Sequence, residues 1–309
     1  MKTKVLMLSK VFPLAMSTYF TRAFQHREDV DIRTVGYYSG TKIPWKRGMN
    51  LPTKYAIPPT YPLFNDVPVV YWDYVKGMLG DWQPDLVITV DAGVRFDVKP
   101  DLGKVVHVAT DPHVILYDKA REICDKFYNM QFCYKYFDDV YLPYAFDQYA
   151  HYSEPQEKKY DCALIGMPYP KRDVLVSELR RNGISVVYEN GPIFDEYREL
   201  NNQAQIGLNY SSMLDMTARV FELMAMGIAP VINRVPDLDL FFVEGKHYLG
   251  FDTVSEAVQQ VKSLLAKPLE IARIGGSAYA NVWQPNYSGY ATHSYSARVH
   301  TILQDMELI

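Results

Sequence analysis

The sequence predicts an α/β protein with two domains, each built on a parallel β-sheet. The chain has 309 residues, which is long for one domain and suits two. Short apolar segments alternate with helical ones in the first half, and the alternation restarts after a polar segment at 151–159. Residues 204–233 read as strand, helix and strand, which is the βαβ unit of a parallel sheet.

The composition excludes several classes of protein. A hydrophobic content of 48% suffices for large cores, and a net charge of −4 argues against a nucleic-acid coat protein. The three cysteines have no close pairs, so they indicate a reducing compartment and neither a disulfide framework nor a zinc site. No apolar run reaches the roughly 18 residues that span a bilayer. The N-terminus lacks a signal-like cleavage site. We expect a soluble, cytoplasmic protein with no membrane span.

The first domain is predicted to cover residues 1–152. Its expected strands span 4–8, 31–38, 85–90, 104–109 and 139–142. Its expected helices span 17–27, 69–82 and 119–136. The proline-rich stretch 40–68 mixes basic residues with aromatics. Such a long irregular stretch is often functional and could grip a polyanion or stack on sugar rings or bases. The alternative, which is slightly favoured, is an ordered surface loop with a few solvated lysines.

Asp111 and His113 follow the strand at 104–109 directly, with Pro112 between them. Aspartate before proline is a good helix start, so a helix is expected to begin here. Ligands of open α/β sheets bind at the carboxyl ends of the strands, where either side chain could act as acid, base or charge stabiliser. The alternative, that Asp111 only caps and His113 only packs, carries about equal weight. His107, which alternates with two valines, is expected to be buried and hydrogen-bonded.

The second domain is predicted to cover residues 153–290, followed by a C-terminal helical segment, 291–309, that can pack back on the first domain. Its expected strands span 160–165, 184–188, 206–210, 229–232 and 247–251. Its expected helices begin near residues 171, 195, 218, 255 (capped by Ser255) and 269. Between the first strand and helix, Gly166 precedes Lys171 and Arg172, and cations after a glycine loop at a helix start often hold phosphate. The alternative is that the glycine only forms a turn and that the two cations are solvated.

Arg219 and Glu222 lie three residues apart, on one face of the helix that begins near 218, which Asp215 or Thr217 can cap. Arg219 falls in the first turn, where free N–H groups favour an anion. Glu222, one turn further, could accept hydrogen bonds from two vicinal hydroxyls, such as those of a ribose. In isolation, a surface salt bridge between the two is favoured. Their place beside a cationic glycine loop favours a nucleoside diphosphate site.

Several segments, in the right order, carry a resemblance to a known family. They are KKYDCALIGMPYPKRDVLVSELRRNGI, DEYRELNNQAQIGLNYS, TARVFELMAMGIAPVIN, FFVEGKHYLGFDTVSEAVQQVKSLLAKP and ATHSYSARVHTIL. Together they cover about 141–303, and they resemble the C-terminal domain of GT-B glycosyltransferases. The likeness is to the spore-maturation CgeB-like group and the related group 1 family. The first half matches in layout only, through PDLVITVD and ATDPHV.

The resemblance implies two Rossmann-like domains with parallel sheets facing across a cleft, and transfer of a sugar, as a hexosyltransferase, from a nucleotide sugar, with UDP favoured. Glu222 would hold the ribose, and the cations Arg219, Lys171 and Arg172 would face the diphosphate. The backbone near Tyr188 and Asn190 would meet the base. The remaining donor-side residues are Gly166, Asp215 and Thr217. Asp111 and His113 would be the catalytic pair, facing the transferred sugar or the acceptor.

The chain departs from the group 1 family in one respect. That family usually has two glutamates eight positions apart, but Leu214 stands eight before Glu222, with Asp215 beside it. Recognition of the sugar, and the stereochemical course, are therefore open. The mechanism needs no metal and no cofactor besides the donor, because cations and helix-end N–H groups can stabilise the leaving group.

The sequence leaves several alternatives open for the acceptor and for the class of reaction. The acceptor is a glycan, a small molecule, a protein or a hydroxylated base in DNA, with DNA ranked below glycan because the chain is acidic. A sugar-nucleotide epimerase can share the layout and the donor site. A non-catalytic nucleotide-sugar binder would keep only the site. The oligomeric state is open.

Overall fold

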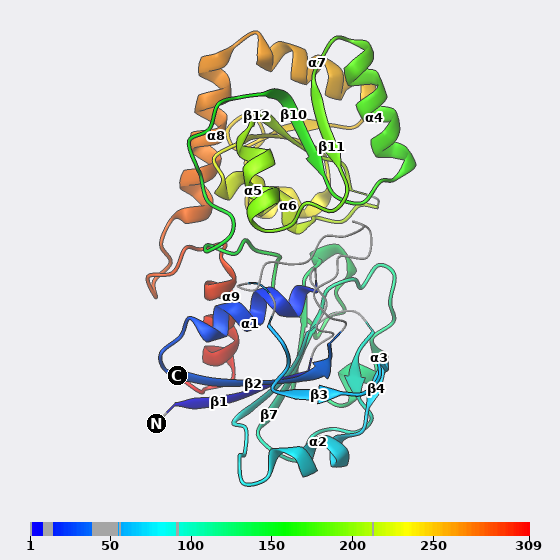
Figure 1. Ribbon diagram of the computed structural model, residues 1–309, viewed down its shortest axis with the longest axis vertical. Coiled ribbons are helices and arrows are strands. Elements are labelled where there is room, and N and C mark those ends of the chain that lie inside the picture. Colours follow the sequence, from blue (N-terminus) through cyan, green and yellow to red (C-terminus); the bar gives the residue numbers. More distant parts are fainter. Residues whose placement is uncertain (1, 9–14, 39–54, 56, 91–92, 212) are drawn as a thin grey trace. The chain divides into compact units, whose positions relative to one another are not determined.

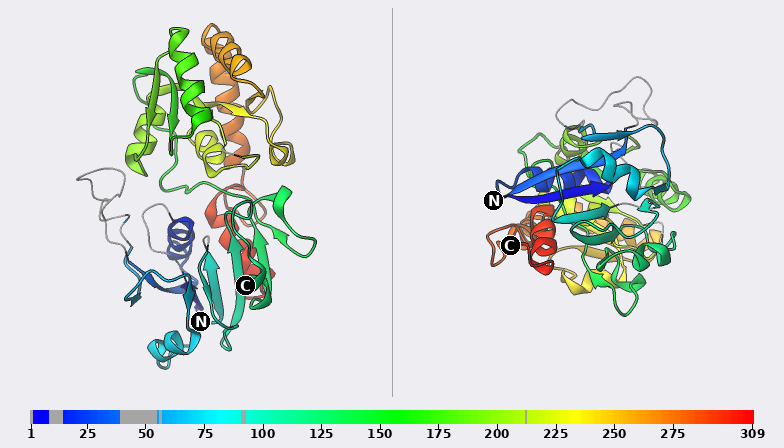
Figure 2. Two further views of the ribbon diagram at one scale, coloured as in Figure 1. Left: turned by 90° about the vertical axis from the view of Figure 1, so that its right-hand side faces the viewer. Right: turned by 90° about the horizontal axis from the view of Figure 1, so that it is seen from below.

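The computed structural model describes residues 2–8, 15–38, 55, 57–90, 93–211 and 213–309. Its Cα positions divide into two compact units. The first unit comprises Met1–Pro143 with Arg298–Ile309, and the second comprises Tyr144–Ala297. Both marked chain ends therefore belong to the first unit (Figures 1 and 2).

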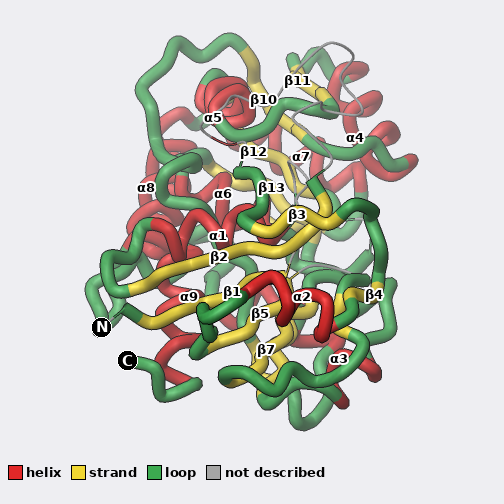
Figure 3. The backbone as a smooth tube through the Cα atoms, turned by 60° about the horizontal axis from the view of Figure 1, so that its bottom comes forward, coloured by secondary structure: helices red, strands yellow, loops and turns green. Residues whose placement is uncertain are grey.

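The first unit is built on a parallel sheet whose described strands run in the order β3-β2-β1-β5-β7-β8-β9. Several of them lie side by side in Figure 3. The strands are β1 (Thr3–Leu8), β2 (Val30–Tyr37), β3 (Tyr61–Leu63), β5 (Leu86–Val90), β7 (Lys104–Ala109), β8 (Lys126–Asn129) and β9 (Val140–Tyr141). A separate parallel pair joins β4 (Val69–Val70) to β6 (Arg95–Phe96). The strand order reverses between β1 and β5, as in a Rossmann-like sheet.

Helices and apolar side chains complete the first unit. The helices of this unit are α1 (Met16–Gln25), α2 (Trp72–Leu79), the short α3 (Asp118–Glu122) and the later part of α9 (Tyr295–Asp305). Trp72 and Leu79 of α2 pack in one cluster with Leu6 and Val87 of the sheet. The chain's last residues belong to the same body, because the Tyr128 hydroxyl donates to Asp305 at 2.9 Å.

The second unit is built on the parallel sheet β11-β10-β12-β13-β14. These strands are β10 (Tyr160–Ile165), β11 (Val186–Glu189), β12 (Ala204–Asn209), β13 (Ala229–Asn233) and β14 (Leu249–Phe251). The helices are α4 (Pro170–Arg181), α5 (Asp195–Asn202), α6 (Ala218–Ala225), α7 (Val254–Leu265) and α8 (Pro268–Trp283). The order reverses between β10 and β12.

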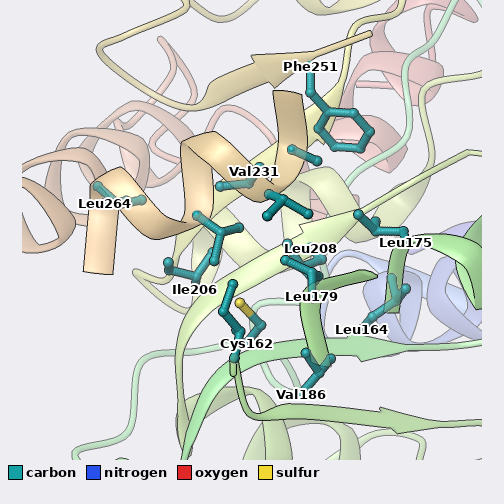
Figure 4. Close-up of a cluster of buried hydrophobic side chains, with 14 of the residues drawn as sticks. Cys162, Leu164, Leu175, Leu179, Val186, Ile206, Leu208, Val231, Phe251 and Leu264 are labelled. Atoms are coloured by element: carbon teal, nitrogen blue, oxygen red, sulfur yellow. The ribbon is translucent and has the colours of Figure 1, made fainter. Parts of the chain in front are cut away.

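The second sheet is covered on both faces. On one face, Leu175 and Leu179 of α4 and Leu264 of α7 pack against Ile206 and Val231 of the strands (Figure 4). On the other face, α5 and α6 contribute residues such as Tyr197 and Leu223 to a second buried cluster. Gly207 of β12 allows α6 to approach closely, because a Cβ there would lie 2.5 Å from Leu223 Cδ2.

Two helix predictions in the first unit are wrong. The expected helix 119–136 ends at Glu122, and residues 126–129 form strand β8 instead. Phe127 and Tyr128 are aromatic residues that favour strands, and pairing with β7 outweighs the helical pattern. The expected helix start at Asp111 is a turn, in which the Asp111 carbonyl accepts from Val114 N and Ile115 N.

Smaller corrections concern the starts of two helices. The expected helix 69–82 begins only at Trp72, because Val69 and Val70 pair with β6. The N-cap of α7 is Thr253 and not Ser255, since the Thr253 hydroxyl accepts from Glu256 N at 3.1 Å.

Candidate functional site

The donor-side residues gather where the second sheet reverses its strand order. Gly166 follows β10 directly, and Asn209 is the last residue of β12. These neighbouring strands flank the reversal, and their carboxyl ends meet at one edge of the sheet. This is the edge where open α/β sheets bind ligands.

Gly166 brings two guanidinium groups together. Its φ is +142°, and a Cβ on it would lie 2.1 Å from Nη2 of Arg219 and 3.7 Å from Nη1 of Arg172. A side chain here would collide with Arg219 and strain the backbone. Both arginine side chains therefore converge on the space that glycine leaves open, one from α4 and one from α6.

The two arginines have no carboxylate partner among the described residues that would neutralise them as a salt bridge. Arg172 is 4% exposed and donates to backbone carbonyls of Tyr210, at 2.7 Å, and Met167, at 2.6 Å. Burial, and then the positive charge of Arg219, lower the pKa of Arg172 to about 10. Positive charge is thus concentrated at the sheet edge.

Asn209 orients the side chain of Arg219. Its Oδ1 accepts from Nη1 of Arg219 at 3.0 Å and from the hydroxyl of Thr217 at 2.9 Å. Thr217 occupies the N-cap position of α6, but its hydroxyl makes no cap hydrogen bond. The Nε of Arg219 is buried and has no hydrogen-bond partner. One donor of the Arg219 guanidinium is therefore unused among the described residues of the unit.

Glu222 lies on the same helix and is buried, with 8% exposure. The surface salt bridge with Arg219 is not formed, so that alternative is wrong. The carboxylate faces His151 instead, with Nε2 of His151 3.8 Å from Oε1 of Glu222. Tyr197 lies beside both groups. Burial, followed by the negative charge of Glu222, raises the pKa of Tyr197 well above its ordinary value, and Arg219 opposes this effect.

The other predicted donor-side residues lie on α4, in the loop before α6 and after β11. Lys171, in the first turn of α4, is exposed, and its Nζ lies 5.8 Å from the centroid of the Tyr210 ring. Asp215 is buried in the loop before α6 and accepts from Met213 N at 3.1 Å. Asn190 follows β11 and is half-buried.

Tyr188, at the end of β11, is also held in place. Its hydroxyl donates to Asp173 of α4 at 2.8 Å. Burial, and then that hydrogen bond, raise the pKa of Tyr188 to about 12. Tyr188 is therefore a neutral phenol that links β11 to α4.

Asp111 and His113 lie in the first unit, whereas the donor-side residues lie in the second. Asp111 follows β7 and accepts from the Thr110 hydroxyl at 3.1 Å. His113 lies beside the ring of Tyr134, 5.6 Å between centroids, and its Nδ1 is buried without a hydrogen-bond partner. A catalytic role for this pair stays a prediction.

The predictions for His107 and for the stretch 40–68 are confirmed or tested only in part. His107 is buried as expected, but its Nε2 has no partner, and burial lowers its pKa to about 3. Most of the basic and aromatic stretch 40–68 lies outside the described residues. Within its described part, Tyr55 is buried and Phe64 is 87% exposed.

Sequence reasoning missed Asn209, Tyr197 and His151 as parts of the site. Asn209 carried a signal, since a polar residue ends a buried strand at the ligand-binding edge. His151 stood in a polar segment that read as a linker, yet it is 1% exposed. Nothing in the local sequence pattern indicates that it meets Glu222.

Comparison with known proteins relates the second half of the chain to a family. Residues 151–304 match the family model described as "Glycosyl transferase-like". The second half of the chain belongs to the glycosyl transferase-like family. No curated protein sequence matches the chain significantly.

Solved structures share the fold of this glycosyltransferase-like chain. A glycosyltransferase from Rickettsia africae superposes with a TM-score of 0.67 at 8% identity, covering 99% of both chains. HepE from Anabaena, in complex with UDP and glucose, superposes with a TM-score of 0.65 at 12% identity, covering 99% of this chain and 100% of its own. A UDP-N-acetylglucosamine 2-epimerase gives 0.57 at 11% identity, covering 100% and 98%.

Family and fold together identify a GT-B glycosyltransferase. The CgeB-like subgroup stays a resemblance. Within the residues described, no helix has the length and apolar character needed to cross a membrane.

Proposed function

We propose that this glycosyltransferase binds a UDP-sugar on its second unit and transfers the sugar to an acceptor hydroxyl. The observation that carries this proposal is the convergence of Arg172 and Arg219 over Gly166. Holding two like charges together in a buried place costs free energy unless an anion lies between them. A diphosphate carries the opposite charge and accepts hydrogen bonds in the forked geometry that guanidinium groups offer.

The neighbouring residues fit the rest of the donor. Beyond the diphosphate, the buried carboxylate of Glu222 is one helical turn away and would accept hydrogen bonds from the ribose hydroxyls. The backbone at residues 188–191 would lie against the base. As the bond to the sugar breaks, the two guanidinium groups stabilise the negative charge that grows on the diphosphate. This stabilisation needs no metal ion. We assign Asp111 and His113 to the acceptor or the transferred sugar.

UDP is favoured as the nucleotide and a hexose as the sugar, since HepE of the same fold was crystallised with UDP and glucose. We place a glycan ahead of a small molecule or a hydroxylated DNA base as acceptor, because the net charge of −4 disfavours a polyanion. Acceptor turnover that falls steeply between 50 and 200 mM salt, on the order of a thousandfold, would favour DNA instead.

The epimerase alternative is supported by the fold shared with a UDP-N-acetylglucosamine 2-epimerase. Incubation with a panel of nucleotide sugars and no acceptor separates the two reactions. A transferase releases free UDP slowly by hydrolysis. Formation of a sugar isomer would contradict the proposal. Binding without turnover, even with acceptors present, would indicate a non-catalytic binder.

The ribose assignment is tested by Glu222→Ala. We expect the affinity for UDP to fall by about tenfold or more, because two hydrogen bonds to a charged acceptor are lost. Binding of inorganic pyrophosphate should be unchanged. Titration calorimetry measures both, and Glu178→Ala, at a half-buried glutamate of α4, is the matched control. A Glu222→Ala variant that binds UDP as well as the wild type refutes the assignment.

A further inference from the structure

A closed turn at the start of the second unit holds the ring of His151. The carbonyl of Asp147 accepts from the backbone N–H groups of Ala150, at 3.0 Å, and His151, at 2.7 Å. The side chain of Asp147 accepts from Tyr149 N at 2.8 Å. Asp147 and His151 are both buried, with 4% and 1% exposure. The imidazole is therefore built into the unit and is not part of a solvated linker.

Contacts from helix α5 fix this turn in place. Arg198 donates to the carbonyl of Ala150 at 3.1 Å, and its guanidinium lies 4.2 Å from the centroid of the Tyr152 ring. The ring of Tyr197 packs edge-on against His151, with 5.7 Å between centroids. These contacts restrict the orientation of the imidazole.

The hydrogen bond at Nδ1 decides where the imidazole proton sits. The backbone N–H of Asp147 donates to Nδ1 of His151 at 3.2 Å. A nitrogen that accepts a hydrogen bond carries a lone pair, so the neutral ring carries its proton on Nε2. Nε2 is the atom that faces Oε1 of Glu222, at 3.8 Å. An N–H donor therefore lies near the carboxylate, somewhat beyond hydrogen-bond distance.

We propose that His151 is a positioning residue for Glu222, and that its Nε2–H orients the carboxylate to accept the two ribose hydroxyls. A glutamate has several rotatable bonds, and a donor on its far side reduces the orientations open to it. The separation of 3.8 Å closes when the carboxylate is drawn into a complex, as polar contacts of unliganded sites commonly do. This role rests on the proposed function, since it concerns the same donor site.

Two substitutions separate positioning from a merely structural role. In His151→Asn, the amide oxygen stands near the place of Nδ1, so the hydrogen bond from Asp147 is kept and the Nε2 donor is lost. In His151→Gln, the amide nitrogen stands near the place of Nε2, so the donor towards Glu222 is kept. Positioning predicts that asparagine is the worse replacement, whereas a structural role at the turn predicts that glutamine is.

The measurement is the dissociation constant for UDP and for inorganic pyrophosphate, with thermal unfolding followed in parallel. We expect His151→Asn to bind UDP about tenfold more weakly and pyrophosphate as the wild type does, because only the ribose contact depends on the donor. His151→Gln should stay within about threefold of the wild type for both ligands. In a Glu222→Gln background, His151→Asn should have no further effect on UDP binding.

Three results would overturn the role of His151. They are equal UDP affinity of His151→Asn and the wild type, a larger loss in a folded His151→Gln than in His151→Asn, or an undiminished effect in the Glu222→Gln background. Failure of the wild type itself to bind UDP, or any other nucleoside diphosphate, would refute the proposed function and this role with it. The two failures are therefore distinguishable.

Discussion

Replacing Arg219 by glutamine should weaken binding of a nucleoside diphosphate by about 30-fold and leave the free protein as stable as the wild type. The substitution removes the charge, the unpartnered Nε and the hydrogen bond from Nη1 to Asn209, because a glutamine side chain ends about where Nε stands. One charge-assisted hydrogen bond contributes about 2 kcal/mol, and about 1.4 kcal/mol corresponds to a tenfold change in affinity.

The free protein should not suffer, because Arg219 lies beside another cation. Its charge contributes to lowering the pKa of Arg172, after burial, so removing it relieves a repulsion. That relief offsets the loss of the contact with Asn209. We expect the free energy of unfolding to change by less than about 1 kcal/mol.

Titration calorimetry with UDP measures the affinity, and urea unfolding without ligand measures the stability. The parent nucleoside, uridine, is the control ligand, because it lacks the phosphates. Arg181→Gln, at an exposed arginine of α4, is the control variant with the same change in net charge. The assignment of Arg219 to the diphosphate is refuted if Arg219→Gln binds UDP normally, or if it loses as much affinity for uridine as for UDP.

Two predictions concern the scaffold. Gly207→Ala should lower the free energy of unfolding by about 1–2 kcal/mol, because the added Cβ would overlap Leu223. The control Gly276→Ala, with no atom within 4 Å of its Cβ, should be neutral or stabilising. Equal effects of the two substitutions in urea unfolding would contradict the close packing of α6. Burial raises the pKa of Asp139, but hydrogen bonds led by Arg121 outweigh it, and the net pKa is lowered. Asp139→Asn should therefore cost about 3 kcal/mol at pH 7. The deficit should begin to shrink as the pH falls below about 4, where the carboxylate of the unfolded chain is protonated, and should keep shrinking until the folded carboxylate, whose pKa is lower, is protonated as well. A deficit independent of pH would show that its charge does not matter.

Periodicity and residue spacing were enough to predict the elements of the second unit closely. Strand 160–165 and the helix that begins at Ala218 lie where the sequence places them. The resemblance to glycosyltransferases implied that Arg219, Lys171 and Arg172 face one diphosphate, and the side chains of Arg219 and Arg172 do approach each other at Gly166. The distance between the two guanidinium groups depends on the crossing of two elements, and no local pattern contains it.

The misses have a common physical cause. Lys126–Asn129 became a strand because β7 offered an unpaired edge, and that edge is distant in sequence. Asn209 meets Arg219 only after the chain has passed through a loop and entered α6. His151 meets Glu222 across 71 positions in sequence, from 151 to 222. Contacts of this kind are decided by tertiary packing, which outweighs local propensity.

The division of the first unit into two sequence segments affects how the protein is made. The second unit is one continuous segment, Tyr144–Ala297, so it can fold while synthesis continues. The first unit includes Arg298–Ile309, and Asp305 accepts from the Tyr128 hydroxyl and forms an ion pair with Lys126. The part that is translated first is thus the part that is completed last. Until residues 298–309 leave the ribosome, the first unit exposes an incomplete surface to which a chaperone can bind.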